Sequence, residues 1–196
     1  MNGAVPKGKL RVVVTYLEMH APPDGLAADV PLPGLSIERT DTVSVPFYRD
    51  LYARIGEAWL WSDRTRLDDA TLGRVIADPA TSFQILRGPE GDPAGYAEMV
   101  AARDEVQLAY FGLVPAYTGR GIGPWFLRRF LRRAWESNPR RVWLHTCSLD
   151  HPAALRMYRA AGFVANREET IVQDDPRLVG LVPRSAGAHI PLADGV

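Results

Sequence analysis

The chain has 196 residues, of which 46% are hydrophobic and 23% are charged. This is enough for one globular domain with a sizeable core. The formal net charge is zero, so the overall charge favours neither nucleic acid nor a membrane as a partner. The single cysteine, Cys147, excludes a disulfide framework and suits the reducing cytoplasm, where we expect the protein.

The sequence predicts no signal peptide, membrane span or metal site. Arg11, Thr15 and Glu18 interrupt the first apolar run, which therefore differs from a signal peptide. No stretch approaches the roughly 20 apolar residues of a membrane span. The 4 histidines show no metal-ligand spacing.

The first part of the chain predicts a strand and two helices. Alternating valines predict a strand over Lys9–Met19. Residues 20–34 are rich in proline and glycine and form a loop, whereas residues 37–41 are ambiguous. Pro46 suits the first turn of a helix, and a second helix is expected over residues 67–78.

Aromatic residues gather in and after the first of these helices. They are Phe47, Tyr48, Tyr52, Trp59 and Trp61. Such a stripe is typical of a buried core, and the alternative is the lining of a pocket for a second substrate.

The later part of the chain predicts five more strands and two more helices. The expected elements are a meander over residues 81–86, 95–102 and 105–114, a helix from Gly121 or Gly123 to about residue 137, a strand over Arg141–Cys147, a helix capped by Asp150 or His151 and ended by Gly162, a last strand to residue 172, and an extended tail over residues 173–196. This order predicts an α+β, three-layer fold, with one mixed sheet flanked by helices in a single domain.

Seven arginines lie between residues 120 and 141 and are opposed in that stretch only by Glu136. This pattern is typical of a solvated helix face. The alternative is that part of the patch meets the phosphates of a ligand.

A glycine-rich loop lies at the start of the longest predicted helix. Residues 113–124 read Leu-Val-Pro-Ala-Tyr-Thr-Gly-Arg-Gly-Ile-Gly-Pro. Glycines at alternate positions let the chain bend sharply, and the helix start offers N–H groups to an anion such as phosphate. The loop lacks the Gly-Lys-Ser/Thr of a Walker loop, and its third glycine comes one residue too early for a dinucleotide fingerprint. A tight turn without a ligand is the remaining alternative.

This loop resembles the pyrophosphate loop of the GNAT superfamily of N-acetyltransferases, which reads Arg/Gln-x-x-Gly-x-Gly/Ala after a strand that ends near Val-x-Pro. Gly121 and Gly123 fill the two glycine positions, and Pro115 fills the proline position. Thr118 stands where the family usually has arginine or glutamine. The loop therefore keeps the backbone part of the pattern and lacks one of its side chains.

Residues 142–163 resemble the C-terminal motif of the same superfamily, a strand, a polar cap and a helix that reads Asn-x-x-Ala-x-x-x-Tyr-x-x-x-Gly-Phe. The matching residues are Ala154, Tyr158, Gly162 and Phe163. His151 takes the asparagine position. The resemblance covers about residues 81–172 and implies the GNAT fold.

The resemblance implies a reaction in which an acetyl group passes from acetyl-CoA directly to a primary amine. Acetyl-CoA is expected between the strands at residues 105–114 and 141–147, with its pantetheine arm along the first strand and its pyrophosphate at the glycine loop. The residues implied to bind it are Phe111, Gly112, Leu113, Gly119, Arg120, Gly121, Ile122, Gly123, Pro124 and His151. A backbone N–H near Leu113 is expected to polarise the thioester carbonyl.

Tyr158 is the predicted general acid, because the family places the matching tyrosine next to the cofactor sulfur. A phenol with a pKa near ~10 can protonate a departing thiolate whose pKa is near ~8.5. The family often has a glutamate base where Gln107 stands here. Glu98, which lies in an otherwise apolar strand, is the predicted base, and Glu105 or a water molecule is the alternative.

Two alternatives remain at the level of function. The fold could keep coenzyme A as a ligand or sensor after losing catalysis. His145 and Cys147 share a strand face and could relay an acyl group, although a buried structural cysteine is the simpler interpretation. The sequence identifies neither the acceptor nor the length of the acyl group, and homodimers are common in the family.

Overall fold

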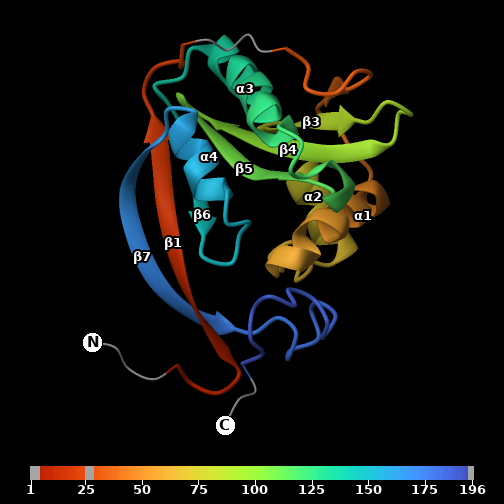
Figure 1. Cartoon of the computed structure of the whole chain (residues 1–196), viewed down its shortest axis with the longest axis vertical. Coiled ribbons are helices and arrows are strands. Elements are labelled where there is room, and N and C mark those ends of the chain that lie inside the picture. The colour runs from red at the N-terminus through yellow and green to blue at the C-terminus, as the bar shows by residue number, and fades with distance from the viewer. Residues whose placement is uncertain (1–4, 25–28, 194–196) are drawn as a thin grey trace.

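A computed structural model describes residues 5–24 and 29–193 of the chain (Figure 1). Its centre is one mixed sheet with the strand order β2-β3-β4-β5-β6-β1-β7. The strands are β1 (Lys9–Met19), β2 (Ser36–Thr40), β3 (Thr81–Arg87), β4 (Pro93–Ala102), β5 (Glu105–Leu113), β6 (Arg141–Cys147) and β7 (Val164–Asp174). The helices are α1 (Val45–Gly56), α2 (Asp69–Ile76), α3 (Ile122–Ala134) and α4 (Ala154–Ala160).

The helices cover both faces of the sheet, as the predicted three-layer α+β fold requires. On one face, α3 and α4 pack over β1, β5 and β6, and the side chains of Phe126, Phe130 and Leu131 are fully buried there. On the other face, α1 and α2 bury Leu51 and Leu72 against β3 and β4. The predicted fold class is therefore confirmed.

The arginine-rich stretch is partly neutralised by carboxylates. On α3 the buried residues recur at helical spacing, and the arginines lie largely on the opposite side. Arg133 pairs with Glu136 at 2.7 Å. Arg141 on β6 pairs with Glu18 on β1 at 2.7 Å and with Glu105 on β5 at 2.8 Å. The last two pairs join three neighbouring strands at one end of the sheet.

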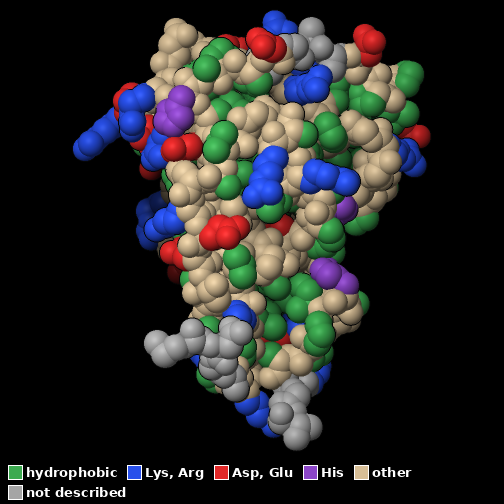
Figure 2. Space-filling model, turned by 60° about the vertical axis from the view of Figure 1, so that its left-hand side comes forward, with side chains coloured by type: hydrophobic (Ala, Val, Ile, Leu, Met, Phe, Trp, Pro, Cys, Tyr) green, Lys and Arg blue, Asp and Glu red, His purple; other side chains and the backbone are tan. Residues whose placement is uncertain are grey.

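The N-terminal strand β1 lies between β6 and β7 and runs antiparallel to both. Its register places Val14 opposite Cys147 on one side and opposite Glu169 on the other. Strand β7 forms the edge of the sheet. Figure 2 brings this side of the molecule forward and shows acidic and basic side chains interspersed over the face. Charges of both signs near an edge strand disfavour pairing with another sheet.

Three segments differ from the expectations. The ambiguous residues 37–41 mostly join β2, which pairs with β3 and becomes the other edge of the sheet. Helix α4 begins at Ala154, later than the predicted caps at Asp150 or His151. The C-terminal segment (residues 175–193), expected to be extended, is a compact series of turns. Within the described ranges, no helix has the length and apolar character needed to cross a membrane.

Candidate functional site

A cavity of about 830 Å³ opens where β5 and β6 separate. The two strands pair in parallel only from Glu105 and Arg141 to Gln107 and Trp143. Beyond these pairs, β5 continues to Leu113 and β6 to the end of its own range. Backbone groups of the separated parts face the cavity without a neighbouring strand, so an extended ligand can pair with them.

A β-bulge in the neighbouring strand pair contributes to this separation. Glu98 on β4 lies opposite Tyr110, whereas the next residue, Met99, lies opposite Leu108, so that β5 has one extra residue, Ala109. A bulge of this kind bends the strand that carries it and increases its twist. The extra residue lies two positions after Gln107, the last residue of β5 that pairs with β6, so the bulge coincides with the point where the two strands part.

The glycine loop forms one end of the cavity. Gly119 and Gly121 have φ angles of 79° and 73°, which side chains with a Cβ rarely adopt. Gly121 is the N-cap of α3, and no side chain bonds to this helix start. The first N–H groups of α3 therefore remain available, and together with the helix dipole they suit a pyrophosphate. A Cβ built on either glycine meets no atom within 4 Å, so the loop has an open surface for a ligand.

Most of the residues implied to bind acetyl-CoA line this cavity. They are Phe111, Gly112, Leu113, Gly119, Gly121, Gly123, Pro124 and His151. Arg120 and Ile122 are not in the wall. The side chain of Ile122 is fully buried in the core under α3, so this residue can offer a ligand only its backbone N–H, and the side chain of Arg120 is exposed to solvent.

Tyr158 lines the same cavity and is nearly buried. Its ring packs edge-on against Phe111 at 6.4 Å and against Phe163 at 6.0 Å, between ring centroids, which fixes its orientation. Burial raises the pKa of Tyr158, and the negative charge of Asp150 raises it further. The phenol therefore stays protonated at neutral pH and is able to donate a proton.

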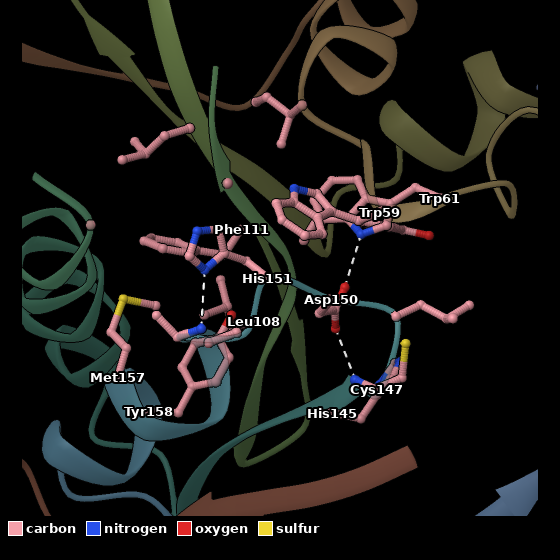
Figure 3. Close-up of a pocket in the computed structure, with 18 of the residues that line it drawn as sticks. Trp59, Trp61, Leu108, Phe111, His145, Cys147, Asp150, His151, Met157 and Tyr158 are labelled. Atoms are coloured by element: carbon pink, nitrogen blue, oxygen red, sulfur yellow. Dashed lines mark hydrogen bonds between the residues drawn. The ribbon is translucent and has the colours of Figure 1, made fainter. Parts of the chain in front are cut away.

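Asp150 ties the two sides of the cavity together (Figure 3). One carboxylate oxygen accepts hydrogen bonds from the Cys147 N–H at 2.8 Å and from the Thr146 hydroxyl at 2.7 Å. The other accepts from the Trp61 indole N–H at 3.1 Å. Next to it, the His151 Nδ1 accepts the N–H of Ala153 at 3.0 Å, which holds the turn that precedes α4.

Aromatic side chains line the end of the cavity opposite the glycine loop. They are Tyr52, Trp59, Trp61 and Tyr110. The rings of Tyr52, Trp61 and Tyr110 lie 5.4 to 5.5 Å apart. Core packing, the interpretation preferred from the sequence, holds for Tyr48, whereas Trp59 and Trp61 belong to the pocket wall.

Trp59 also brings the C-terminal segment to the cavity. Its ring lies 4.9 Å from His151 and 5.1 Å from His189, and both contacts are edge-on. The segment is held by Arg177, which pairs with the fully buried Asp175 at 2.7 Å and donates to the carbonyls of Ile190 and other residues of the segment. Burial alone would raise the pKa of Asp175, but the Arg177 guanidinium holds it below its ordinary value.

Glu98, the predicted base, lies beside the cavity and not in its wall. It is fully buried, and its carboxylate accepts hydrogen bonds from the Tyr48 hydroxyl and from Arg64 Nη2, both at 2.6 Å. Arg64 lines the cavity, and its guanidinium lies 5.0 Å from the ring centre of Tyr110. Burial alone would lower the pKa of Arg64, but Glu98 raises it, so the guanidinium stays charged.

The alternative base, Glu105, lies at the end of β5 where the strands still pair. It bonds to Arg140 and Arg141 and is not in the cavity wall. The carboxylates that do line the cavity are Asp63 and Asp150. Neither Asp63 nor Arg64 belongs to a motif, so no pattern in the sequence identifies them as residues of the cavity wall.

His145 and Cys147 both line the cavity, as two residues on one strand face should. Burial raises the pKa of Cys147 to about 12, and the nearby charge of Asp150 contributes. The thiol is therefore protonated at neutral pH and is a weak nucleophile, which disfavours an acyl relay. In the described part of the chain, no group of three or more His, Cys, Asp or Glu residues is placed to hold a metal ion.

The sequence model of the acetyltransferase (GNAT) family matches residues 44–163, more than half of the chain. A comparison with curated proteins finds no match. The matched range includes α1 and α2, which precede the two motifs seen in the sequence.

Solved structures with the same fold have low sequence identity. A GCN5-related N-acetyltransferase from Sphaerobacter thermophilus has a TM-score of 0.60 and 16% identity, over 86% of this chain and 51% of that chain. One from Kribbella flavida has a TM-score of 0.56 and 19% identity, over 88% and 63%. A spermidine N-acetyltransferase from Vibrio cholerae has a TM-score of 0.54 and 14% identity, over 78% of this chain and 98% of that chain.

These likenesses show the fold alone, and the chain spans only about half to two thirds of the length of the first two proteins. The match to the family model, in contrast, shows the family. The chain belongs to the acetyltransferase (GNAT) family.

Proposed function

We propose that the protein is an N-acetyltransferase that moves an acetyl group from acetyl-CoA directly to a primary amine. One observation supports this most. The separated strands β5 and β6, the uncapped start of α3 and Tyr158 all open into one cavity. A thioester bound along β5 would thus lie near Tyr158, the proposed acid, and in the same cavity as an acceptor that enters from the aromatic end.

Each part of the cavity has a role in this reaction. Acetyl-CoA supplies the activated acetyl group as its thioester. The backbone of β5 near Leu113 binds the pantetheine arm and donates an N–H to the thioester carbonyl, and the N–H groups between Gly119 and Gly123 bind the pyrophosphate. Pro124 has no N–H and donates nothing. The amine nitrogen forms its bond to the acetyl carbon as the carbon–sulfur bond breaks.

Two proton transfers complete the reaction. Tyr158 donates its proton to the departing thiolate and is then reprotonated from solvent. The amine gives one proton to water. Glu98 accepts hydrogen bonds from Tyr48 and Arg64 and does not reach the cavity wall. A general base would have to contact the amine. We therefore assign Glu98 the role of positioning Arg64.

The alternative function is a binding module that holds coenzyme A without catalysis. Replacing Tyr158 by phenylalanine separates the two functions. If the protein is an enzyme, Tyr158→Phe lowers kcat by about 100-fold while the acetyl-CoA affinity stays the same, because only the proton donor is lost. If it is a binding module, neither the native protein nor the variant releases free thiol from acetyl-CoA with any amine.

The experiment that tests the proposal is a calorimetric titration with acetyl-CoA, followed by a screen of primary amines for thiol release. Micromolar binding and amine-dependent release support the proposal. Absence of binding by the folded native protein would overturn both functions together.

The setting of the reaction is part of the same proposal. The lone Cys147 suits the reducing cytoplasm, and we expect a homodimer, as is common in the family. Light scattering of the purified protein measures the oligomeric state directly.

A further inference from the structure

The charges in the wall at the aromatic end of the cavity restrict the acceptor. The charged residues of the wall at this end are Asp63, Arg64 and Asp150. The fourth charged residue of the wall, Arg156, lies on α4, the helix that also carries Tyr158. The positive charge of Arg64 is balanced by the buried Glu98 at 2.6 Å. The remaining charge at the acceptor end is negative.

The two acidic residues differ in what they can still bind. Asp150 already accepts three hydrogen bonds, from a backbone N–H, a hydroxyl and the indole of Trp61. Asp63 is exposed, and the described residues provide it with no hydrogen bond and no ion pair. Asp63 is therefore the carboxylate at this end that is available to a ligand.

Asp63 also lies close to the aromatic wall. Burial raises the pKa of Tyr110 to about 12, and the charge of Asp63 contributes to that rise, as it does at Tyr52. Together with Trp59 and Trp61, these rings give the acceptor end an apolar surface around one free carboxylate. Such a surface suits methylene groups, and an ammonium group near aromatic rings gains a further cation–π attraction.

We propose that Asp63 binds a second cationic group of the acceptor, so that the acceptors are diamines or longer polyamines with an apolar spacer. This inference rests on the proposed function. One amine reaches the thioester, the spacer lies along Trp59 and Trp61, and the far ammonium pairs with Asp63. An acceptor with a carboxylate at that place meets repulsion from Asp63, and Arg64 offers it no compensation because Glu98 already balances its charge.

Binding of two matched products tests this inference without relying on turnover. N-acetyl-1,6-diaminohexane keeps an ammonium at the far end, whereas N-hexylacetamide has none. Each is titrated into the native protein with and without saturating coenzyme A. We expect the first compound to bind at least about tenfold more tightly than the second, the effect of one charge-assisted contact.

Two variants locate the effect. Asp63→Asn should remove the difference in affinity between the two compounds. Asp29→Asn, a matched change of an exposed aspartate outside the cavity wall, should preserve it. Circular dichroism confirms that both variants fold.

Other results would overturn the inference. It fails if the two compounds bind native protein equally, or if Asp63→Asn leaves the preference intact. It also fails if 6-acetamidohexanoate, which carries a far carboxylate, binds as well as the ammonium compound. Failure of the proposed function would be visible separately, as absence of acetyl-CoA binding in the same instrument.

Discussion

The two ends of the cavity are built in different ways. The end that we assign to acetyl-CoA consists mainly of backbone: two left-handed glycines, an uncapped helix start and an unpaired strand edge. The end that we assign to the acceptor consists of side chains from separate segments, such as Trp61 after α1, Tyr110 on β5 and Asp150 after β6. The backbone-built end can serve any protein of this fold, whereas the end built from side chains can differ from one protein to the next.

The largest expected effect lies at the acceptor end. Arg177→Met keeps most of the side-chain volume but leaves the buried Asp175 without its counter-ion, which should lower the free energy of unfolding by about 3–5 kcal/mol. Urea denaturation measures this loss. Arg184→Met, an exposed change in the same segment, should stay within about 0.5 kcal/mol of the native protein.

The same variant sharpens the comparison between the two ends. The C-terminal segment contacts Trp59 and does not contribute to the glycine-loop end of the wall. Under conditions in which Arg177→Met is still folded, acceptor binding should therefore weaken more than acetyl-CoA binding. Equal weakening of both would show that the two ends are not separable in this way.

The second effect concerns the backbone-built end. Gly123 lies in the first turn of α3 with an ordinary φ, so Gly123→Glu adds bulk and negative charge without backbone strain. We expect acetyl-CoA affinity to fall by about 100-fold, roughly 2.7 kcal/mol. Calorimetry measures the change, and Ala116→Glu, which adds the same charge outside the cavity wall, is the control. Similar losses in both variants would mean that general charge repulsion, and not the loop, determines affinity.

A third, smaller effect should reach both ends together. Asp150→Asn replaces a charged acceptor of three hydrogen bonds with an amide, one side of which is itself a donor. The loss of a charge-assisted contact should cost about 2 kcal/mol of stability. It should also weaken the affinities for acetyl-CoA and for the acceptor, since Asp150 joins Trp61 to the turn before Tyr158. A change confined to one end would contradict this role.

The smallest expected effect lies where the strands remain paired. The pKa of Glu18 is lowered to about 2 from an ordinary value of 4.5, mainly by the hydrogen bond from Arg141 and to a smaller extent by that from His20. Because the folded pKa is depressed, this carboxylate stabilises the fold fully above pH 4.5, and its contribution disappears as the pH falls toward 2. Glu18→Gln should therefore cost about 1 kcal/mol at neutral pH and flatten the acid side of the stability curve. Denaturant titrations between pH 2 and 7 can detect the change.

The sequence predicted those parts of the molecule that depend on local pattern. The bounds expected for β1 and β6 match the structure, and the glycine loop lies where its spacing placed it. The Pro46 signal also identified the start of α1, which Ser44 caps. In each case the structure is decided by residues that are close in the chain.

The parts that were missed depend on contacts between distant residues. Glu98 is predicted as a base because it is a carboxylate in an apolar strand, and the sequence does not reveal that Arg64, from a different segment, forms an ion pair with it. Likewise, nothing in the sequence indicates that Arg177 donates to the carbonyls of Ile190 and Pro191, which lie farther along the chain. Side-chain pairs of this kind leave no periodic pattern in the sequence, so the acceptor end could not be derived from it.

The position of β1 has a consequence for how the protein is made. This strand leaves the ribosome before the other described strands, whereas both of its neighbours, β6 and β7, follow all of the others. During translation the valine-rich segment must therefore wait without partners, and the meander of β3, β4 and β5 can form before it. Pairings between the two ends of a chain are slow to form. The interval before β1 inserts is therefore the period in which its unpaired apolar segment is most exposed to aggregation.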